Sequence, residues 1–529
     1  MSNNKKIIKK QLHEHYEILK NSHLSDLFSN DKNRGKHFTS KFHNLLIDYS
    51  KNHITDETLE LLLNYAKELD IKKSINAMFS GKEINVTEGC AVLHHALRAK
   101  PEKVLVLKDD EIIKEIKDEL KNIKRFVSLV HDKKLTGWTN KPFDTYVNIG
   151  IGGSDLGTKM VVNALNQYRE EKTRSFFISN IDGEQIELLK KTINPETTLF
   201  IISSKSFKTI ETTTNADVIK SWLLKSGCDD ISKHFVAVTS NFETAKDFGI
   251  GKENIFKTWN WVGGRFSLWS AVGLPVALAI GFENFEKMLL GAYKLDEHFL
   301  SEPLEKNIPI ILALIDYWYI NFYGAPTHAI IPYDESLHYF PSYLSQLFME
   351  SNGKSTDRSG NIVSHKTGAI VWGAIGTNSQ HSVSQLLHQG KHVVPIDFLA
   401  PLMKKGDQNH HELLLANCLA QSRALMQGEN NKKSFLNFDG NKPSTTILYN
   451  ELTPETLGSL LAIYEHRVFV QGLLLEINSF DQYGVELGKK VALDISKKLA
   501  NKEKNINTDS STQNLIDIYI KSKEKNSEN

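Results

Sequence analysis

The chain has 529 residues, of which 40% are hydrophobic and 24% charged, a balance typical of soluble globular proteins. Lysine and arginine total 64 against 63 aspartate and glutamate residues, for a net charge of +1, so charge gives no argument for a nucleic-acid or membrane partner. A chain of this length is too long for one simple core, and we expect two domains.

The cysteines lie far apart and form no CxxC pair: Cys90, Cys228 and Cys418. This spacing argues against a disulfide framework or a cysteine zinc site and fits a reducing compartment. No apolar signal segment follows the N-terminal methionine. The longest apolar stretch, residues 267–282, contains Pro275 and is shorter than a membrane span. We therefore expect a cytoplasmic protein in which residues 267–282 form a buried helix.

Helical patterning dominates the first hundred residues, most clearly over residues 57–69. From about Phe143 onward, short strand-like runs alternate with helical stretches, at residues 146–149, 175–179, 198–203 and 235–238. A second set of strand-like runs follows a helix-rich bridge, at residues 327–331, 369–372 and 392–398. Alternation of this kind is typical of parallel sheets that are covered by helices on both faces.

These patterns predict an α/β protein with two domains, each a mainly parallel sheet flanked by helices, with helical extensions at both ends. The expected parts are a helical N-terminal segment that packs on the larger domain (1–120), a first α/β domain (121–285), a second α/β domain (286–500), and a C-terminal helix or tail (501–529). In the tail, apolar residues at helical spacing predict a terminal helix: Leu515, Ile516, Tyr519 and Ile520.

Two segments of the first domain have the pattern of a phosphate-binding loop. Residues 150–157 (GIGGSDLG) follow one strand-like run, and residues 203–209 (SSKSFKT) end another. A helix is expected after each, so backbone N–H groups and a helix N-terminus would point at one place, which suits an anion. Each segment taken alone could equally be a tight strand-to-helix turn or an N-cap cluster. The two together favour a phosphorylated ligand.

Nucleotide and metal motifs are incomplete. The third glycine of a dinucleotide fingerprint is replaced by Asp155, and the first glycine of a P-loop ending at Gly353 is replaced by Phe348. HExxH is absent, and the histidine pairs 94–95 and 410–411 are adjacent rather than four residues apart. We expect neither a metal nor a cofactor.

Four side chains outside the loops could take part in catalysis or binding, namely Glu350, His381, Arg265 and Lys489. Gln346 and Glu350 share a helix face just before a turn-forming Asn-Gly, where the carboxylate could act as a general base. His381 lies seven residues before His388 on an expected helix face and could move a proton. On pattern alone, an exposed helix glutamate and a capping or core histidine are the more ordinary interpretations.

Arg265 follows two glycines, which let the backbone approach another group closely while the guanidinium reaches an anion. A structural arginine–carboxylate pair is the alternative. Lys489 lies in the segment NSFDQYGVELGKK and could be a surface lysine paired with Glu486 at i,i+3.

Taken together, the chain resembles the phosphoglucose isomerase family. The resemblance covers residues 85–489, and its most specific blocks are VGGRFSLWSAVGLP, LFMESNGK, GTNSQHS with the following HQG, and NSFDQYGVELGKK. It implies two sugar-isomerase (SIS) domains and a homodimer. It also implies metal-free interconversion of glucose 6-phosphate and fructose 6-phosphate, by ring opening and a cis-enediolate, in glycolysis and gluconeogenesis.

The resemblance also implies roles for individual residues. Glu350 would carry a proton between C2 and C1, Arg265 would stabilise the enediolate, and His381 and Lys489 would open the sugar ring. Because the family's matching histidine comes from the partner subunit, the active site would lie at the dimer interface. The implied substrate-binding residues are Gly153, Ser154, Ser204, Lys205, Ser206 and Thr209 for the phosphate, with Gln346 and Gln482.

The chain departs from the usual family pattern at five positions: Cys90, Thr158, Ser206, Lys208 and Ile210. Ser206 keeps the hydroxyl of the usual threonine, whereas Lys208 changes the charge beside the expected phosphate site. Two alternatives remain at this point: an isomerase for another sugar phosphate, and a sugar-phosphate-binding regulator without turnover. The regulator would be expected to lack the base, yet all four implied catalytic residues are present.

Overall fold

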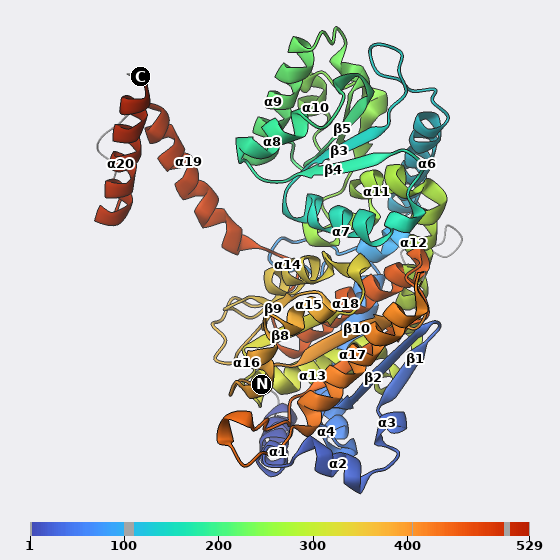
Figure 1. Ribbon diagram of the computed structural model, residues 1–529, viewed down its shortest axis with the longest axis vertical. Coiled ribbons are helices and arrows are strands. Elements are labelled where there is room, and N and C mark those ends of the chain that lie inside the picture. The colour runs from blue at the N-terminus through green and yellow to red at the C-terminus, as the bar shows by residue number, and fades with distance from the viewer. Residues whose placement is uncertain (1–2, 100–109, 405, 502–507, 528–529) are drawn as a thin grey trace. The chain divides into compact units, whose positions relative to one another are not determined.

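The computed structural model describes residues 3–99, 110–404, 406–501 and 508–527 (Figure 1). By its internal contacts the chain falls into two units, Met1–Phe480 and Asp481–Asn529. The first unit contains two β-sheets, each flanked by helices, which confirms the predicted α/β fold with mainly parallel sheets. No helix within the described ranges is long and apolar enough to cross a membrane.

The first sheet has five parallel strands in the order β4-β3-β5-β6-β7. They are β3 (Thr145–Ile149), β4 (Arg174–Ile178), β5 (Thr198–Ser203), β6 (Phe235–Thr239) and β7 (Ile255–Lys257). Every residue of β3, β5 and β6 is buried. Alternate residues pack on opposite faces. Figure 1 shows the helices that cover them, with α7 (Leu156–Ala164) and α11 (Leu274–Ile280) on one face and α8 (Gly183–Lys190), α9 (Ile210–Lys225) and α10 (Phe242–Phe248) on the other.

The second sheet has six strands in the order β1-β2-β11-β10-β8-β9. They are β1 (Thr39–Phe42), β2 (Leu45–Lys51), β8 (Thr327–Pro332), β9 (Ile370–Gly373), β10 (Ile396–Pro401) and β11 (Ser444–Tyr449). The four strands from β11 to β9 are parallel, and β1 and β2 add an antiparallel hairpin at one edge.

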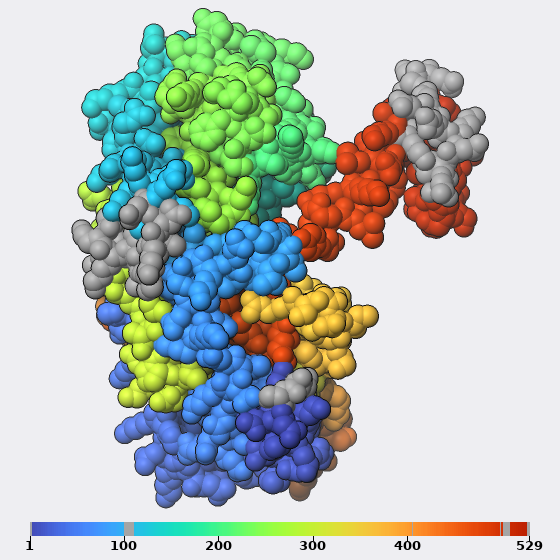
Figure 2. Space-filling model, turned by 180° about the vertical axis from the view of Figure 1, so that it is seen from behind, coloured from blue at the N-terminus to red at the C-terminus, as the bar shows by residue number. Residues whose placement is uncertain are grey.

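The hairpin adds two strands to an N-terminal segment for which helical patterning was predicted. Leu45, Ile47 and Tyr49 are buried at every second position of β2, which is the strand period. The run is too short to stand out among the surrounding helices, and it becomes a strand because it pairs with β11, about four hundred residues later in the chain. In Figure 2 the blue N-terminal residues cover the lower part of the visible face.

All seven predicted strands are present. The last begins later than expected, because β10 starts at Ile396 and not at residue 392. Besides the hairpin, the sequence patterns missed β7 and β11. The expected helix over residues 267–282 is also corrected: this stretch contains two 3₁₀ segments, ending at Trp269 and Gly273, before α11 begins at Leu274. Pro275 lies in the first turn of α11, where its missing N–H costs no hydrogen bond.

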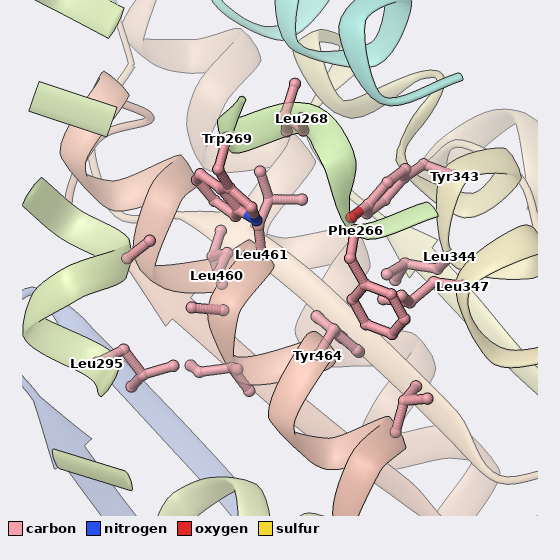
Figure 3. Close-up of a cluster of buried hydrophobic side chains, with 14 of the residues drawn as sticks. Phe266, Leu268, Trp269, Leu295, Tyr343, Leu344, Leu347, Leu460, Leu461 and Tyr464 are labelled. Atoms are coloured by element: carbon pink, nitrogen blue, oxygen red, sulfur yellow. The ribbon is translucent and has the colours of Figure 1, made fainter. Parts of the chain in front are cut away.

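The core between the sheets is built on α18 (Pro454–Leu474), which is buried along its entire length. It packs against α12 (Phe282–Ser301), α13 (Ile308–Asn321) and α14 (Phe340–Asn352). Figure 3 shows leucines of α18 beside Trp269, and Phe266 beside Tyr343, Leu344 and Leu347 of α14. The apolar contacts of Phe266 therefore anchor the segment that carries Arg265.

The other helices of the first unit are α1 (Asn3–Leu19), α2 (Leu24–Asn30), α3 (Arg34–His37), α4 (Asp56–Glu68), α5 (Ile71–Phe79), α6 (Asp110–His131), α15 (Gly376–Gln380), α16 (Ser384–Gln389) and α17 (Gln408–Gln427). Helix α4 confirms the helix predicted over residues 57–69. The second unit contains α19 (Glu486–Asn501) and α20 (Ser510–Ser527), the latter being the predicted terminal helix. The limits of the four parts proposed from sequence stay a prediction.

Candidate active site

The two predicted phosphate loops begin side by side. Strands β3 and β5 are neighbours in the sheet, and Ile149 pairs with Ile202 at their carboxyl ends. Because β4 lies on the other side of β3, the chain crosses over at this point, and such a topological switch point is where α/β sheets form ligand crevices. A direct link joins the loops: Asn148 Oδ1 accepts from Ser203 Oγ at 2.8 Å, and its Nδ2 donates to the Ser154 carbonyl at 2.9 Å.

The serine-rich loop is folded tightly and ends at a helix. Ser204 is buried and its hydroxyl donates to Thr209 Oγ1 at 3.3 Å, while the Ser206 side chain is exposed. Phe207 has a φ of 54°, a left-handed conformation that a non-glycine residue keeps only when its surroundings hold it. Thr209 is the N-cap of α9. Hydroxyl groups and the free N–H groups of a helix start therefore lie together at the carboxyl end of β5.

The glycine-rich loop touches the segment that carries Arg265. A Cβ atom added at Gly153 would lie 2.3 Å from the Gly264 carbonyl oxygen and 2.6 Å from the Arg265 nitrogen. Only a residue without a side chain allows this approach. The glycines before Arg265, which were predicted to permit a close backbone contact, thus pack against the glycine-rich loop at Gly153.

Lys205 ties the serine-rich loop to the same segment. Its ammonium group donates to the carbonyls of Asn260 and Val262, at 3.0 and 3.2 Å. Burial lowers the pKa of Lys205, an effect that the nearby charge of Glu88 opposes. The lysine predicted to bind phosphate therefore also braces the backbone just before Gly263.

Arg265 is buried, with its side chain 1% exposed. Its Nε donates to Ser351 Oγ and its Nη2 to the Ser479 carbonyl, both at 2.6 Å. Nη1 lies 3.8 Å from Oε1 of Glu350. The guanidinium is thus held on one side by hydrogen bonds and directed at the predicted base on the other.

Glu350 lies at the carboxyl end of α14, and its side chain is 22% exposed, so a ligand can reach it. Oε2 accepts from Gln346 Nε2 at 2.9 Å, which confirms the predicted i,i+4 pair. That amide nitrogen lies 3.2 Å from where a Cβ of Gly152 would stand. The glycine loop, Gln346, Glu350 and Arg265 therefore form one continuous group.

Three buried residues of this group were not predicted as site residues: Ser351, Asn352 and Ser479. They lie within the blocks ESNGK and NSFDQYGVELGKK, but no local period marks them. Their contact with one another depends on the fold, because 127 residues separate Asn352 from Ser479.

His381 is exposed, at the end of the short helix α15. It does not share a helix with His388, which lies in α16, so that expectation was wrong. The turn between the two helices uses residues 381–383. Among the residues that the structure describes, no hydrogen bond or ion pair joins His381 to Glu350 or Arg265.

Gln482 and Lys489 belong to the second unit. Lys489 is in the first turns of α19, where its ammonium lies 2.9 Å from Glu486 Oε1, and both side chains are about 60% exposed. The structure thus contains the i,i+3 pair that the sequence predicted as the ordinary role of this lysine.

The departures from the family pattern differ in their surroundings. Cys90 lies close enough to Lys205 for the lysine charge to act on its thiol, although burial, the larger effect, raises the pKa of Cys90. Thr158 is buried in α7, whereas Lys208 and Ile210 are exposed beside the serine-rich loop. Across the described ranges, no three His, Cys, Asp or Glu side chains are grouped as a metal ion would require.

Comparisons with known proteins agree along almost the whole chain. A family model described as phosphoglucose isomerase matches residues 48–516. The glucose-6-phosphate isomerases of Campylobacter jejuni subsp. doylei and Wigglesworthia glossinidia brevipalpis are 47% and 49% identical, in each case over 96% of both chains. A crystal structure of a glucose-6-phosphate isomerase from Chlamydia trachomatis matches with a TM-score of 0.88 at 33% identity, covering 97% of this chain and 98% of that one.

Proposed function

The chain belongs to the phosphoglucose isomerase family, and from this premise we propose how its residues act. It catalyses the reversible isomerisation of glucose 6-phosphate to fructose 6-phosphate, a step of glycolysis and gluconeogenesis. The observation that carries the assignment of roles is the 3.8 Å approach of Arg265 to Glu350 beside two phosphate-type loops.

The two loops bind the phosphate of the sugar. Ser204, Ser206 and Thr209 supply hydroxyl groups, Gly153 and Ser154 supply the second wall, and the start of α9 adds backbone N–H groups. Lys205 contributes its positive charge while it braces residues 260–262. Binding energy from this remote end of the substrate fixes the reacting carbons against Glu350.

Glu350 is the base. It removes the proton from C2 of the open-chain aldose, the C1–C2 double bond forms, and the negative charge develops on O1. Arg265 stabilises this charge, a role supported by its burial, where a charge is worth more than in water. Glu350 then returns the proton to C1 while the hydroxyl proton of O2 moves to O1, which yields the ketose.

Gln346 orients the base and contacts the substrate. Its Nε2 already donates to Glu350, whereas its buried Oε1 has no hydrogen-bond partner among the described residues. Because a buried acceptor without a donor is costly, this oxygen is suited to accept from a sugar hydroxyl group. Gln482 is the second glutamine that we assign to substrate binding, on the family pattern.

Ring opening is assigned to His381 and Lys489, and the working form to a homodimer whose active site takes His381 from the partner subunit. The exposed position of His381 supports this assignment. So do Leu487 and Val491, which share one face of α19 and are 72% and 47% exposed, since exposed apolar stripes mark interaction surfaces. We place the enzyme in the cytoplasm, where its glycolytic substrates are handled, and divide the chain into the four parts expected from its sequence, with two SIS domains.

A coupled assay with fructose 6-phosphate tests the activity, and turnover is expected without added metal or cofactor. Binding without turnover would overturn the catalytic assignment in favour of a regulator. A preference for another sugar phosphate would overturn the substrate assignment.

Mixing two inactive variants tests the shared site. If Glu350 and His381 of different subunits complete one site, refolding Glu350→Gln together with His381→Ala should restore about a quarter of the wild-type activity, because half of the dimers then hold one intact site. If both residues act within one chain, the mixture stays inactive.

A further inference from the structure

Asn352, the residue two positions after the base, uses its whole side chain in buried hydrogen bonds. It is fully buried at the end of α14. Its Nδ2 donates to the Val468 carbonyl at 3.0 Å and to Gln471 Oε1 at 2.7 Å, and its Oδ1 accepts from Ser479 Oγ at 2.7 Å. A side chain with three such partners fixes the elements that carry them.

Ser479 connects this amide to Arg265. Its hydroxyl donates to Asn352, while its carbonyl accepts from Arg265 Nη2 at 2.6 Å. A second hydrogen bond of the guanidinium, from Nε, goes to Ser351, the neighbour of Asn352 in α14. The acceptors Ser351 and Ser479 are therefore positioned next to or through Asn352.

The helix α18 packs tightly against this hydrogen bond. A Cβ added at Gly472 would lie 1.8 Å from Ser479 Oγ and 3.1 Å from Asn352 Oδ1. A side chain at position 472 would therefore displace the Ser479 hydroxyl. The glycine lets α18 approach the Ser479–Asn352 hydrogen bond directly.

The hydrogen bonds continue into a buried ionic cluster. Gln471 Nε2 donates to Asp316 Oδ2 at 3.3 Å, and Asp316 is held by Arg467 at 2.7 Å. Because Asp316 occupies the amide nitrogen of Gln471, the Gln471 oxygen faces Asn352, and Asn352 must present its NH₂ group there. The orientation of the Asn352 amide is thus set by Asp316, acting through Gln471.

We propose that Asn352 is a positioning residue for the isomerisation, which holds Arg265 at the distance from Glu350 that the enediolate requires. It does so through its hydrogen bond to Ser479. In the sequence, Ser479 comes shortly before Gln482 and Lys489. The inference rests on the proposed function of Arg265. It adds that the guanidinium is aimed by an amide that touches neither the substrate nor Glu350.

Asn352→Asp tests this with almost no change of shape. A carboxylate oxygen would face the Val468 carbonyl and the Gln471 oxygen, where an NH₂ group is needed, and Gln471 could turn only by presenting its oxygen to Asp316. We expect kcat to fall about 10- to 100-fold, the size of effect that a small misplacement of a reacting group causes, while KM for fructose 6-phosphate stays within about twofold of the wild-type value.

A double-mutant cycle with Arg265→Ala separates this inference from the proposed function. If Asn352 acts through Arg265, Asn352→Asp should cost little further kcat once Arg265 is absent. Additive losses would overturn the inference even if Arg265→Ala alone is strongly impaired. If Arg265→Ala alone keeps its kcat, the proposed role of Arg265 fails, and the inference with it.

Two further variants guard against a general loss of structure. Asn52→Asp is the matched control, since Asn52 is 1% exposed and its Nδ2 also donates to two backbone carbonyls, those of Tyr49 and Ser444, neither in the site. It should lower the unfolding temperature without changing kcat, and a loss of kcat equal to that of Asn352→Asp would overturn the proposal. Ser479→Ala keeps the carbonyl that holds Arg265, so it should fold even if Asn352→Asp fails to fold. It should show a smaller loss of kcat than Asn352→Asp, with the same coupling to Arg265→Ala. Additivity in that cycle would also contradict the proposal.

Discussion

The residues assigned to proton transfer and those of the C-terminal segment are held in very different ways. Arg265 is buried and makes two hydrogen bonds of 2.6 Å, and the carboxylate of Glu350 is bound by Gln346. Lys489 lies in another unit of the chain and pairs with Glu486, its own helix neighbour, with both side chains about 60% exposed.

The difference shows what one chain can prepare by itself. A buried guanidinium with fixed acceptors cannot leave its place without losing hydrogen bonds in a region that water does not reach, so its position is built in before substrate binds. An exposed i,i+3 pair contributes little and exchanges partners freely. The first group is preorganised, and the second is available for a partner or a substrate.

The largest effect is expected at the base. Glu350→Gln keeps the shape and a partner for Gln346 but cannot take a proton, so kcat should fall by up to about 10⁴-fold with substrate binding nearly unchanged. The coupled assay measures kcat. Loss of proton exchange at C2 would show that proton removal is the step affected. Turnover close to that of the wild type would remove Glu350 from this role.

Arg265→Ala comes next. Because the negative charge develops only as the enediolate forms, kcat should fall about 10²- to 10³-fold while KM changes far less. Steady-state kinetics with both sugar phosphates separate the two constants. An effect on KM alone would assign Arg265 to the phosphate instead.

A buried ionic cluster formed by His328, Asp316, Asp397 and Arg467 should make the stability of the protein depend on pH. Burial alone would lower the pKa of His328, but the charge of Asp397 and the close ion pairs with Asp316 and Asp397, at 3.4 and 3.0 Å, outweigh it and raise the pKa to about 9. In the unfolded chain this proton leaves near pH 6.5. The contribution is therefore complete below pH 6.5 and is lost as the pH rises through 9, a decrease of about 3 kcal/mol in the free energy of unfolding.

Denaturant titrations of the wild type and His328→Gln between pH 6.5 and 9 give the free energy of unfolding at each pH. The difference between the two slopes of this free energy against pH measures the contribution of His328. His53→Gln is the control. Burial lowers the pKa of His53 to about 4, so the folded protein carries no proton on it in that interval and the unfolded chain loses its own near pH 6.5. Its removal should therefore leave the slope nearly unchanged above about pH 7. Equal slopes for the wild type and His328→Gln would show that His328 does not hold its proton.

The smallest effect is expected in the exposed segment. Glu486→Gln removes the carboxylate that pairs with Lys489 on α19, yet the free energy of unfolding should change by less than about 0.5 kcal/mol. Denaturation followed by circular dichroism tests this value. A loss of several kcal/mol would mean that the pair is buried in the working assembly.

Much of the candidate site could be predicted because its signals are local. A strand that ends in glycines or hydroxyl residues before a helix is visible over ten residues, as at Gly150 and Ser203, and the Gln346–Glu350 pair follows from the helix period. The roles of Arg265, His381 and Lys489 came from resemblance to a family and not from any pattern of their own.

The strands that the sequence patterns missed have weak local signals and depend on pairing between distant segments. Strand β11 and the β1–β2 hairpin are short, and they are stabilised by pairing with each other across about four hundred residues. The 3₁₀ segments before α11 occur where Gly264 must meet Gly153, a contact that no local preference encodes.

By itself, the sequence determined the α/β class, the two loops at strand ends and the Gln346–Glu350 pair, because each depends on neighbours a few positions apart. Only the tertiary structure brought Asn352, Ser479 and Gln471 together beside Arg265. The direction of a buried amide depends on donors and acceptors brought from distant parts of the chain, and these meet only after the helices have packed.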